Sequence, residues 1–285
     1  MLIAQISDLH IRPRGALAYG VSATNLFAEH AIHALLRLAP RPDCVLVSGD
    51  LTDCGLDEEY ALLQELFARL PMPVFAVPGN HDRREPFRRT FAGGGYLPAA
   101  GYLNFTVDRG PVRIVGLDSL VAGESHGALA PETLDFLDSA LAARPEAPTL
   151  VMLHHPPFAT GIGHMDALRL FDGAAELGTL VARHPQIARI LCGHVHRSIQ
   201  TVFGGRTCQI APSVAHQVAL DLRPDAPSCF VLEPPGFLLH AVTDGAVVTH
   251  AATVDRAPGP FPFILPADYP GQARRAEPDA GAIRP

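Results

Sequence analysis

Residues 2–10 of the chain read LIAQISDLH, residues 44–50 read CVLVSGD, and residues 74–82 read VFAVPGNHD. Each stretch opens with a short apolar run that predicts a buried β-strand, and each ends in polar residues. Between these stretches, apolar residues recur at helical spacing or acids gather where a helix would begin. The predicted strands are 2–6, 44–47 and 74–77, and the predicted helices are 23–38 and 57–70. This β-α-β-α-β order predicts a layered α/β core with a parallel portion.

The rest of the chain continues the same alternation. Two apolar runs flank Asp108-Arg109-Gly110-Pro111, whose composition is typical of a tight turn, so adjacent strands are expected there. From residue 198 to about 254 the pattern is mostly short strands and turns, and the last thirty or so residues form a tail rich in Pro, Gly and Ala. Further strands are predicted at 102–107, 112–117, 150–153 and 187–192, and further helices at 131–143 and, largely, 167–183.

Five short polar segments stand out because each follows a predicted strand. Folds of the α/β class place their sites at such strand ends, so five loops at one sheet edge are expected to converge on one pocket. A single Asp-x-His or Gly-Asp arises often by chance, whereas five such segments with compatible chemistry do not. The segments are Ser7-Asp8-Leu9-His10, Gly49-Asp50, Gly79-Asn80-His81-Asp82, His154-His155-Pro156-Pro157 and Gly193-His194-Val195-His196.

The side chains in these segments are typical of a transition-metal site. Carboxylate and amide oxygens together with imidazole nitrogens suit Mn, Fe, Zn or Co better than calcium. Asp8 and His10 are two residues apart, as are His194 and His196, so in an extended segment each pair shares one side. Asp50 is the obvious carboxylate to bridge two cations. No cysteine lies in a ligand position, which disfavours a structural zinc cluster.

Charge counting favours two divalent ions. Against the carboxylates of Asp8 and Asp50, two divalent cations leave a net positive site, and a bound hydroxide lowers that charge by only one. Such a site attracts a phosphodiester monoanion, and metals there activate water at neutral pH and clamp phosphoryl oxygens. The residues therefore predict a binuclear hydrolase in which a metal-bound hydroxide attacks phosphorus.

Composition narrows the class of protein and its partners. The chain has 285 residues and a formal charge of −7, and all 22 of its basic residues are Arg, which argues against binding to a nucleic-acid backbone. No window of about 18 apolar residues predicts a transmembrane helix, and the N-terminus lacks the basic region of a signal peptide. The five cysteines lack Cys-x-x-Cys spacing, which favours a reduced, cytoplasmic protein.

The motif order D-x-H, G-D, G-N-H-D, H and G-H-x-H resembles the signature of the calcineurin-like metallophosphoesterases. Longer strings, including SDLHIRPRGALAYG, PDCVLVSGDLTDCGLDEEY, LHHPP and CGHVHR, resemble the bacterial class III cyclic-nucleotide phosphodiesterases and especially their glycerophosphodiesterase members. The resemblance spans about residues 1–255. It implies an α/β fold, a four-layer α-β-β-α sandwich with a small C-terminal cap. The implied parts are a catalytic core at 1–197, a cap and dimerisation segment with closing strands at 198–254, and an extended tail at 255–285.

The resemblance also implies a role for each motif residue. His81 would face the substrate phosphate without binding metal, so His81 and Asp50 are the predicted catalytic residues. Asn80, His81 and His216 are the predicted substrate-binding residues. The predicted ligands are Asp8, His10 and His196 for one metal and Asn80, His154 and His194 for the other, with Asp50 bridging the two.

Five further residues carry weaker expectations. His216, within the string SVAHQ, resembles a position near the substrate. Tyr19 and Asn25 fall in a shared segment, where they either contact substrate or pack in the core or cap. His155 is expected to pack or to support a ligand. His164 belongs to a predicted loop near the site and has no assigned role.

The predicted activity is hydrolysis of small phosphodiesters, either glycerophosphodiesters or 3′,5′-cyclic nucleotides, with two divalent ions (Mn, Fe, Zn or Co). A phosphomonoesterase or protein phosphatase would share the metal site. A nuclease lacks support because the chain shows no basic, aromatic stripe, and a non-catalytic scaffold would have lost ligands that are all present here. Neither a nucleic-acid duplex nor a membrane is an expected partner. Apolar runs at 230–232 and 237–239 exceed what a small cap buries, so a homodimer or higher homo-oligomer is expected.

Overall fold

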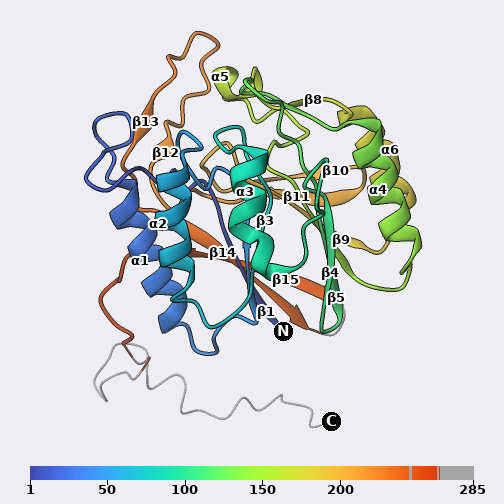
Figure 1. The fold of residues 1–285 in the computed structure, drawn as a ribbon, viewed down its shortest axis with the longest axis horizontal. Coiled ribbons are helices and arrows are strands. Elements are labelled where there is room, and N and C mark those ends of the chain that lie inside the picture. The colour runs from blue at the N-terminus through green and yellow to red at the C-terminus, as the bar shows by residue number, and fades with distance from the viewer. Residues whose placement is uncertain (244–245, 262, 264–285) are drawn as a thin grey trace, which may run out of the picture. The chain divides into compact units, whose positions relative to one another are not determined.

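Two mixed β-sheets lie at the centre of the unit formed by residues 1–255 (Figure 1). The computed structural model of the chain describes residues 1–243, 246–261 and 263. The strands of the first sheet are β1 (Leu2–Ile6), β2 (Cys44–Val47), β3 (Val74–Ala76), β14 (Gly236–Thr243) and β15 (Ala246–Thr253). Those of the second sheet are β4 (Phe105–Arg109), β5 (Val112–Gly116), β7 (Thr149–Met152), β9 (Ile187–Cys192), β10 (Ile199–Phe203) and β11 (Arg206–Ile210).

Both sheets combine parallel strands with antiparallel pairing, which occurs at one edge of the first sheet and at both edges of the second. The first has the order β15-β14-β1-β2-β3, with β1, β2 and β3 parallel. The second has the order β10-β11-β9-β7-β5-β4, with the four central strands parallel. Two short pairs lie outside these sheets, β6 (Gly127–Ala128) with β8 (Leu170–Asp172) and β12 (Gln217–Val218) with β13 (Phe230–Val231).

Helices cover the outer face of each sheet, and Figure 1 shows α1 and α2 on one side of the strands and α4 and α6 on the other. The longer helices each bury one apolar face, as α1 does with Ala28, Ile32 and Leu35. Acids in the first turn of α2 and a proline at the start of α4 favour helix initiation. The helices are α1 (Thr24–Arg37), α2 (Asp57–Phe67), α3 (Arg84–Phe91), the short 3₁₀ helix η1 (Ala92–Gly94), α4 (Pro131–Ala142), α5 (Gly163–Asp166) and α6 (Ala174–Arg183).

Three apolar layers hold these elements together. Along β1, Ala4 and Ile6 pack towards α1 and α2, whereas Ile3 packs towards the second sheet. On the far side of the second sheet, Val151 of β7 packs with Leu177 of α6. Because the central strands are covered on both faces, they read as continuous apolar runs. The predicted four-layer α-β-β-α fold is confirmed.

The structure differs from the predicted helices in one boundary and in one additional helix. Residues 167–183 are helical only from Ala174, because Leu170 pairs with Gly127 in a short strand and Gly173 turns the chain with a φ of 81°. The helix α3 was not predicted from the sequence, since its string REPFRRTF shows only two buried apolar residues, Phe87 and Phe91.

Four strands of the segment 198–254, namely β10, β11, β14 and β15, belong to the two main sheets. Strand β14 pairs antiparallel with β1, so Phe237 and Leu238 are buried in the core. The interpretation of 237–239 as surplus apolar surface for a subunit contact is therefore wrong. Residues 211–235 lie between β11 and β14, and we call them the cap segment. The predicted boundary at residue 197 and the dimerisation role stay predictions, and most of the predicted tail lies outside the described residues.

Candidate metal centre

All five polar segments meet at the carboxyl ends of the parallel strands. Asp8 and His10 follow β1, Asp50 follows β2, and Asn80 follows β3, while the other segments follow β7 and β9. Six of the seven predicted ligands are buried, and Asn80 is half-buried. They line or underlie a cavity of about 500 Å³. The predicted convergence on one pocket is thus observed, whereas the assignment of each ligand stays a prediction.

Backbone strain concentrates at these ligand positions. Among the described residues, six that are not glycine have a positive φ, and five of them are predicted ligands. This left-handed conformation is unfavourable for a side chain with a β-carbon, and it persists where surrounding structure enforces it, commonly at functional sites. The six are Asp8 (55°), His10 (47°), Tyr19 (52°), Asp50 (49°), His194 (72°) and His196 (56°).

Two motif glycines allow the loops to approach each other. A β-carbon at Gly49, where φ is 99°, would lie 2.2 Å from the ring of His154. A β-carbon at Gly79 would lie 2.2 Å from Oδ1 of Asp50. Both distances are too short for atoms that are not bonded to each other, so any larger residue at either position would displace a predicted ligand. This explains why glycine precedes the ligand in G-D and in G-N-H-D.

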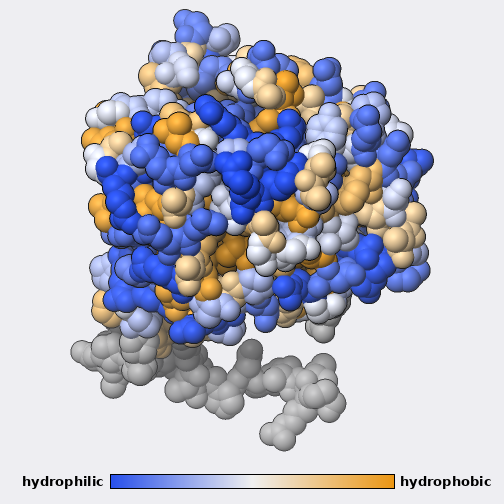
Figure 2. All heavy atoms as spheres, in the orientation of Figure 1, coloured by the Kyte–Doolittle hydropathy of each residue, from blue (hydrophilic) through white to orange (hydrophobic). Residues whose placement is uncertain are grey.

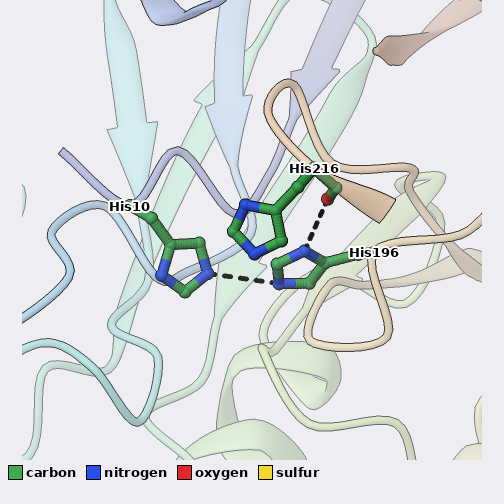
Figure 3. A group of neighbouring side chains, drawn as sticks. All are labelled: His10, His196 and His216. Atoms are coloured by element: carbon green, nitrogen blue, oxygen red, sulfur yellow. Dashed lines mark hydrogen bonds between the residues drawn. The ribbon is translucent and has the colours of Figure 1, made fainter. Parts of the chain in front are cut away.

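Three of the ligand imidazoles are anchored in the same way. In each, Nδ1 donates a hydrogen bond to an oxygen, which leaves Nε2 with a lone pair that faces the other ligands. The bonds are His10 Nδ1 to Asp53 Oδ1 (3.1 Å), His154 Nδ1 to the Ser48 carbonyl (2.7 Å) and His196 Nδ1 to the His216 carbonyl (2.8 Å), the last drawn in Figure 3.

The atoms of the first ligand group lie close to the spacing that a bound cation would impose. His10 Nε2 lies 3.1 Å from His196 Nε2 and 3.7 Å from Asp50 Oδ2, and His196 Nε2 lies 3.5 Å from Asp8 Oδ1. Metal–nitrogen bonds of about 2.0–2.1 Å set neighbouring ligand atoms about 3.0–3.4 Å apart. Because the Nδ1 atoms of His10 and His196 donate hydrogen bonds elsewhere, the lone pairs on their Nε2 atoms face each other. A cation between the two Nε2 atoms would stabilise that arrangement.

The second group shares an atom with the first. His154 Nε2 lies 3.2 Å from Asp50 Oδ2 and 3.2 Å from Asn80 Oδ1. Nε2 of His194 is buried and has no hydrogen-bond partner, which is costly unless a cation binds it. Asp50 Oδ2 thus faces histidines of both groups, as a bridging ligand would. The residues present fit two divalent ions.

Electrostatics favours the metal-binding forms of three of these side chains, His194, His196 and Asp50. Burial lowers the pKa of His194 far below 6.5 and that of His196 to about 3, so both are neutral at pH 7. Burial also opposes a charge on His154, but the carboxylate of Asp50 outweighs it and raises that pKa to about 9. Burial likewise disfavours a charged Asp50, yet His154 and His81 hold its pKa well below 3.8. A cation would replace the proton of His154, so metal binding should release it.

Two carboxylates support the site, and sequence reasoning assigned neither a role. Asp82 accepts hydrogen bonds from the backbone N–H groups of Leu51 and Gly79 and from the hydroxyl of Tyr60, which ties the loops after β2 and β3 together. Asp53 orients His10 through its side chain. The G-N-H-D string contains Asp82, but only its contacts reveal this function.

His81 is fixed at the pocket by two bonds. Its backbone N–H donates to Asp50 Oδ1 at 2.9 Å, and its ring Nδ1 donates to the carbonyl of Asp53 at 2.7 Å. The ring stands edge to face with that of His10 at 4.6 Å and lines the pocket. Nε2 is therefore the ring nitrogen that is available to a bound molecule.

The residues with weaker expectations differ in placement. His216 is buried against the first group, its ring 4.9 Å from that of His196 and 5.4 Å from that of His10 (Figure 3). His155 lies behind the second group, bound to Ser119 Oγ at 2.8 Å and 4.7 Å from the ring of His194, so it supports a ligand.

Tyr19 and His164 line the pocket, whereas Asn25 is not among its lining residues. Asn25 instead makes two hydrogen bonds of 2.9 Å with the backbone of Arg12 and so has a structural role.

The cap segment and α5 both contribute to the lining of the pocket. Val218 and Phe230 of the cap segment line one wall, and His164 and Met165 of α5 line another. The two walls approach each other, since a β-carbon at Gly161 would lie 3.5 Å from the side chain of Leu222. Access to the predicted ligands is therefore restricted to small molecules or small parts of larger ones.

Comparison with known proteins places this site in a family. Residues 1–198 match the family model for calcineurin-like phosphoesterases. The chain belongs to this family. A probable glycerophosphodiester phosphodiesterase, GpdQ of Arcobacter nitrofigilis, is 38% identical over 264 residues, which cover 92% of this chain and 97% of the relative. The 3′,5′-cyclic adenosine monophosphate phosphodiesterase CpdA of Pseudomonas aeruginosa is 32% identical over 259 residues, 90% of each protein.

Solved structures agree on the fold. A dimetal phosphatase from Danio rerio superposes with a TM-score of 0.65 over 90% of this chain and 96% of its own, at 13% identity. For a calcineurin-like phosphoesterase, the clusters of His and Asp side chains in the pocket indicate divalent-metal binding. The family resemblance predicted from the five motifs is confirmed.

Proposed function

We propose that this calcineurin-like phosphoesterase is a two-metal phosphodiesterase that hydrolyses small phosphodiesters, either glycerophosphodiesters or 3′,5′-cyclic nucleotides. One observation carries the proposal: Oδ2 of Asp50 lies 3.7 Å from Nε2 of His10 and 3.2 Å from Nε2 of His154, which joins two ligand groups. Two divalent ions held there would supply an activated water at neutral pH and a positive clamp for phosphoryl oxygens.

The residues divide into proposed metal ligands and proposed substrate contacts. The first group would hold one ion through Asp8, His10 and His196, and the second would hold the other through Asn80, His154 and His194, with Asp50 common to both. Nε2 of His81 would face the phosphoryl group from the pocket wall. Asn80 and His216 border the same space and would contact the substrate.

The size of the pocket supports a small substrate. Its volume of about 500 Å³ is within the range usual for small-molecule sites. Enclosure by the cap segment and α5 disfavours a folded protein or a nucleic-acid duplex, and the net charge of −7 does the same for nucleic acid. The relatives described above are named for glycerophosphodiesters and for a cyclic nucleotide, which agrees with either substrate class.

A substrate panel tests this function. Enzyme reconstituted with Mn²⁺ would be given glycerophosphoethanolamine, 3′,5′-cyclic AMP and the monoesters glycerol 3-phosphate and AMP. We expect a higher kcat/KM for at least one diester than for either monoester. Faster monoester hydrolysis would replace the proposal with a phosphomonoesterase, and no turnover of any compound would favour a non-catalytic scaffold.

Metal content gives a prediction that does not depend on turnover. Seven ligands in two groups should bind two divalent ions, so protein that is purified without chelator and reloaded with manganese should approach two equivalents per chain by elemental analysis. The donor set also suits Fe, Zn and Co. Saturation at one equivalent would contradict the two-metal site.

We expect a homodimer or higher homo-oligomer. The cap segment exposes Leu220 (62%), Leu222 (61%) and Leu232 (54%), and their burial in a subunit contact would be favourable. Figure 2 shows apolar residues in small groups among hydrophilic ones on the face that it draws. Light scattering at micromolar concentration should give at least twice the chain mass, and a monomer would refute the expectation.

A cytoplasmic location is also proposed. All five cysteines are unpaired, which is usual in a reducing compartment. None of the described helices has the length and hydropathy to cross a bilayer.

A further inference from the structure

Tyr19 has a backbone conformation that its residue type disfavours. Tyr19 and Gly20 both have positive φ, 52° and 69°, and the N–H of Val21 donates to the carbonyl of Ala18 at 3.1 Å. This is the pattern of a type I′ turn, whose first central position prefers Asn, Asp or Gly. Among the described residues that are not glycine, Tyr19 is the one with a positive φ outside the predicted ligand set. A bulky aromatic residue there is a conformational outlier.

The strain places the ring of Tyr19 at the mouth of the pocket. Its centroid lies 5.5 Å from that of His216, edge to face at 88°, and 5.4 Å from that of Phe230. The rings of His216 and Phe230 are 4.9 Å apart. All three line the pocket, and we call them the aromatic wall. Tyr19 is 58% exposed, so part of its ring surface is free to contact a bound molecule.

The surroundings of the aromatic wall favour a neutral, flat group over a cationic one. Among the described residues that line the pocket, Asp50 is the one carboxylate, and it belongs to the ligand set. Asp53 is engaged by His10 at 3.1 Å and by Arg12 at 3.3 Å. Aromatic rings can bind a quaternary ammonium group, but the proposed divalent ions next to the wall would repel it.

We propose that Tyr19 and Phe230 are specificity-determining residues that stack a flat unsaturated ring, such as a nucleobase, carried by the phosphodiester. The inference rests on the proposed function and deepens it. Stacking on an aromatic side chain accepts any base, because every base has a π-face. This role would explain the strain at Tyr19, because Asn, Asp and Gly suit the turn better but have no aromatic ring.

Four variants test the wall. Tyr19→Asn suits the turn but removes the aromatic ring, and Phe230→Leu removes a ring while it keeps apolar volume. Tyr19→Phe keeps the ring. Val21→Ala is the control, because Val21 is exposed on the same turn and does not line the pocket. We expect Tyr19→Asn and Phe230→Leu to lower kcat/KM for 3′,5′-cyclic AMP about tenfold more than that for glycerophosphoethanolamine. Tyr19→Phe and Val21→Ala should keep the wild-type ratio.

Thermal unfolding separates this role from a structural one. Because Asn is favoured at this turn position, Tyr19→Asn should keep or raise the Tm while selectivity falls. Equal losses on both substrates with a lower Tm would overturn the inference, as would an unchanged substrate ratio. A selective loss on glycerophosphocholine alone would assign the wall to a cation instead.

Binding of AMP, the product that carries a base, distinguishes failure of the inference from failure of the proposed function. Calorimetry should show about tenfold weaker AMP binding to Tyr19→Asn than to the wild type. If no diester is hydrolysed but this difference is present, the wall stands and the proposed function fails. If glycerophosphodiesters are hydrolysed but AMP binds both proteins equally, the wall fails and the proposed function stands.

Discussion

Replacement of Asp50 by Ala should remove metal from both sites and lower turnover by about 10³-fold or more, the loss that corresponds to several kcal/mol of transition-state stabilisation. Among the described contacts, Oδ2 of Asp50 faces His10 in one ligand group and His154 in the other. Its Oδ1 accepts the N–H of His81, so the position of that residue should also change. Elemental analysis and kcat on a single diester are the measurements.

Two variants make the comparison specific. Asn80→Ala removes a ligand atom that contacts only the second group, 3.2 Å from His154 Nε2, so it should weaken one metal and leave the other bound. Asp50→Asn keeps the shape of the side chain but removes its charge, so both ions should bind more weakly than in the wild type. If Asp50→Ala retains two equivalents of metal and near-normal turnover, Asp50 is not a bridging ligand.

Elements that depend on local pattern could be predicted from the sequence. The strands β1 and β2 have the predicted bounds, because each is an apolar run that ends in small or acidic residues and is buried on both faces. The five motifs also predicted one pocket, because parallel strands that share a sheet place their carboxyl ends at one edge. Fold class and ligand types therefore followed from the order of short segments.

Features that depend on distant pairing or on backbone conformation could not be predicted. Strand β14 lies beside β1, with Leu2 opposite Ala241. No pattern in the sequence near Phe237 predicts that this segment pairs with β1. Helix α3 is short and rich in Arg, so its apolar periodicity is weak. The strained turn at Tyr19 and the anchoring role of Asp53 are visible only once the loops are folded together.

Replacement of His81 by Ala should slow the hydrolysis of alkyl phosphodiesters by about 10²–10⁴-fold, the usual contribution of general acid catalysis. The ring is held by its Nδ1, which donates to the carbonyl of Asp53 at 2.7 Å, so Nε2 is the nitrogen that can pass a proton to a leaving oxygen. His30→Ala, which removes an exposed imidazole that does not line the pocket, is the matched control and should leave both rates unchanged.

The leaving group separates two roles for His81. An alkoxide such as that of glycerol needs a proton as it departs, whereas a nitrophenolate leaves readily without one. If His81 donates the proton, His81→Ala should slow glycerophosphoethanolamine hydrolysis far more than that of bis(p-nitrophenyl) phosphate. Equal losses on both compounds would exclude the acid role and assign His81 to charge stabilisation at the phosphoryl group. Unchanged rates on both would exclude His81 from the reaction, and its contacts with Asp50 and Asp53 would then serve only to hold the loop after β3 in place.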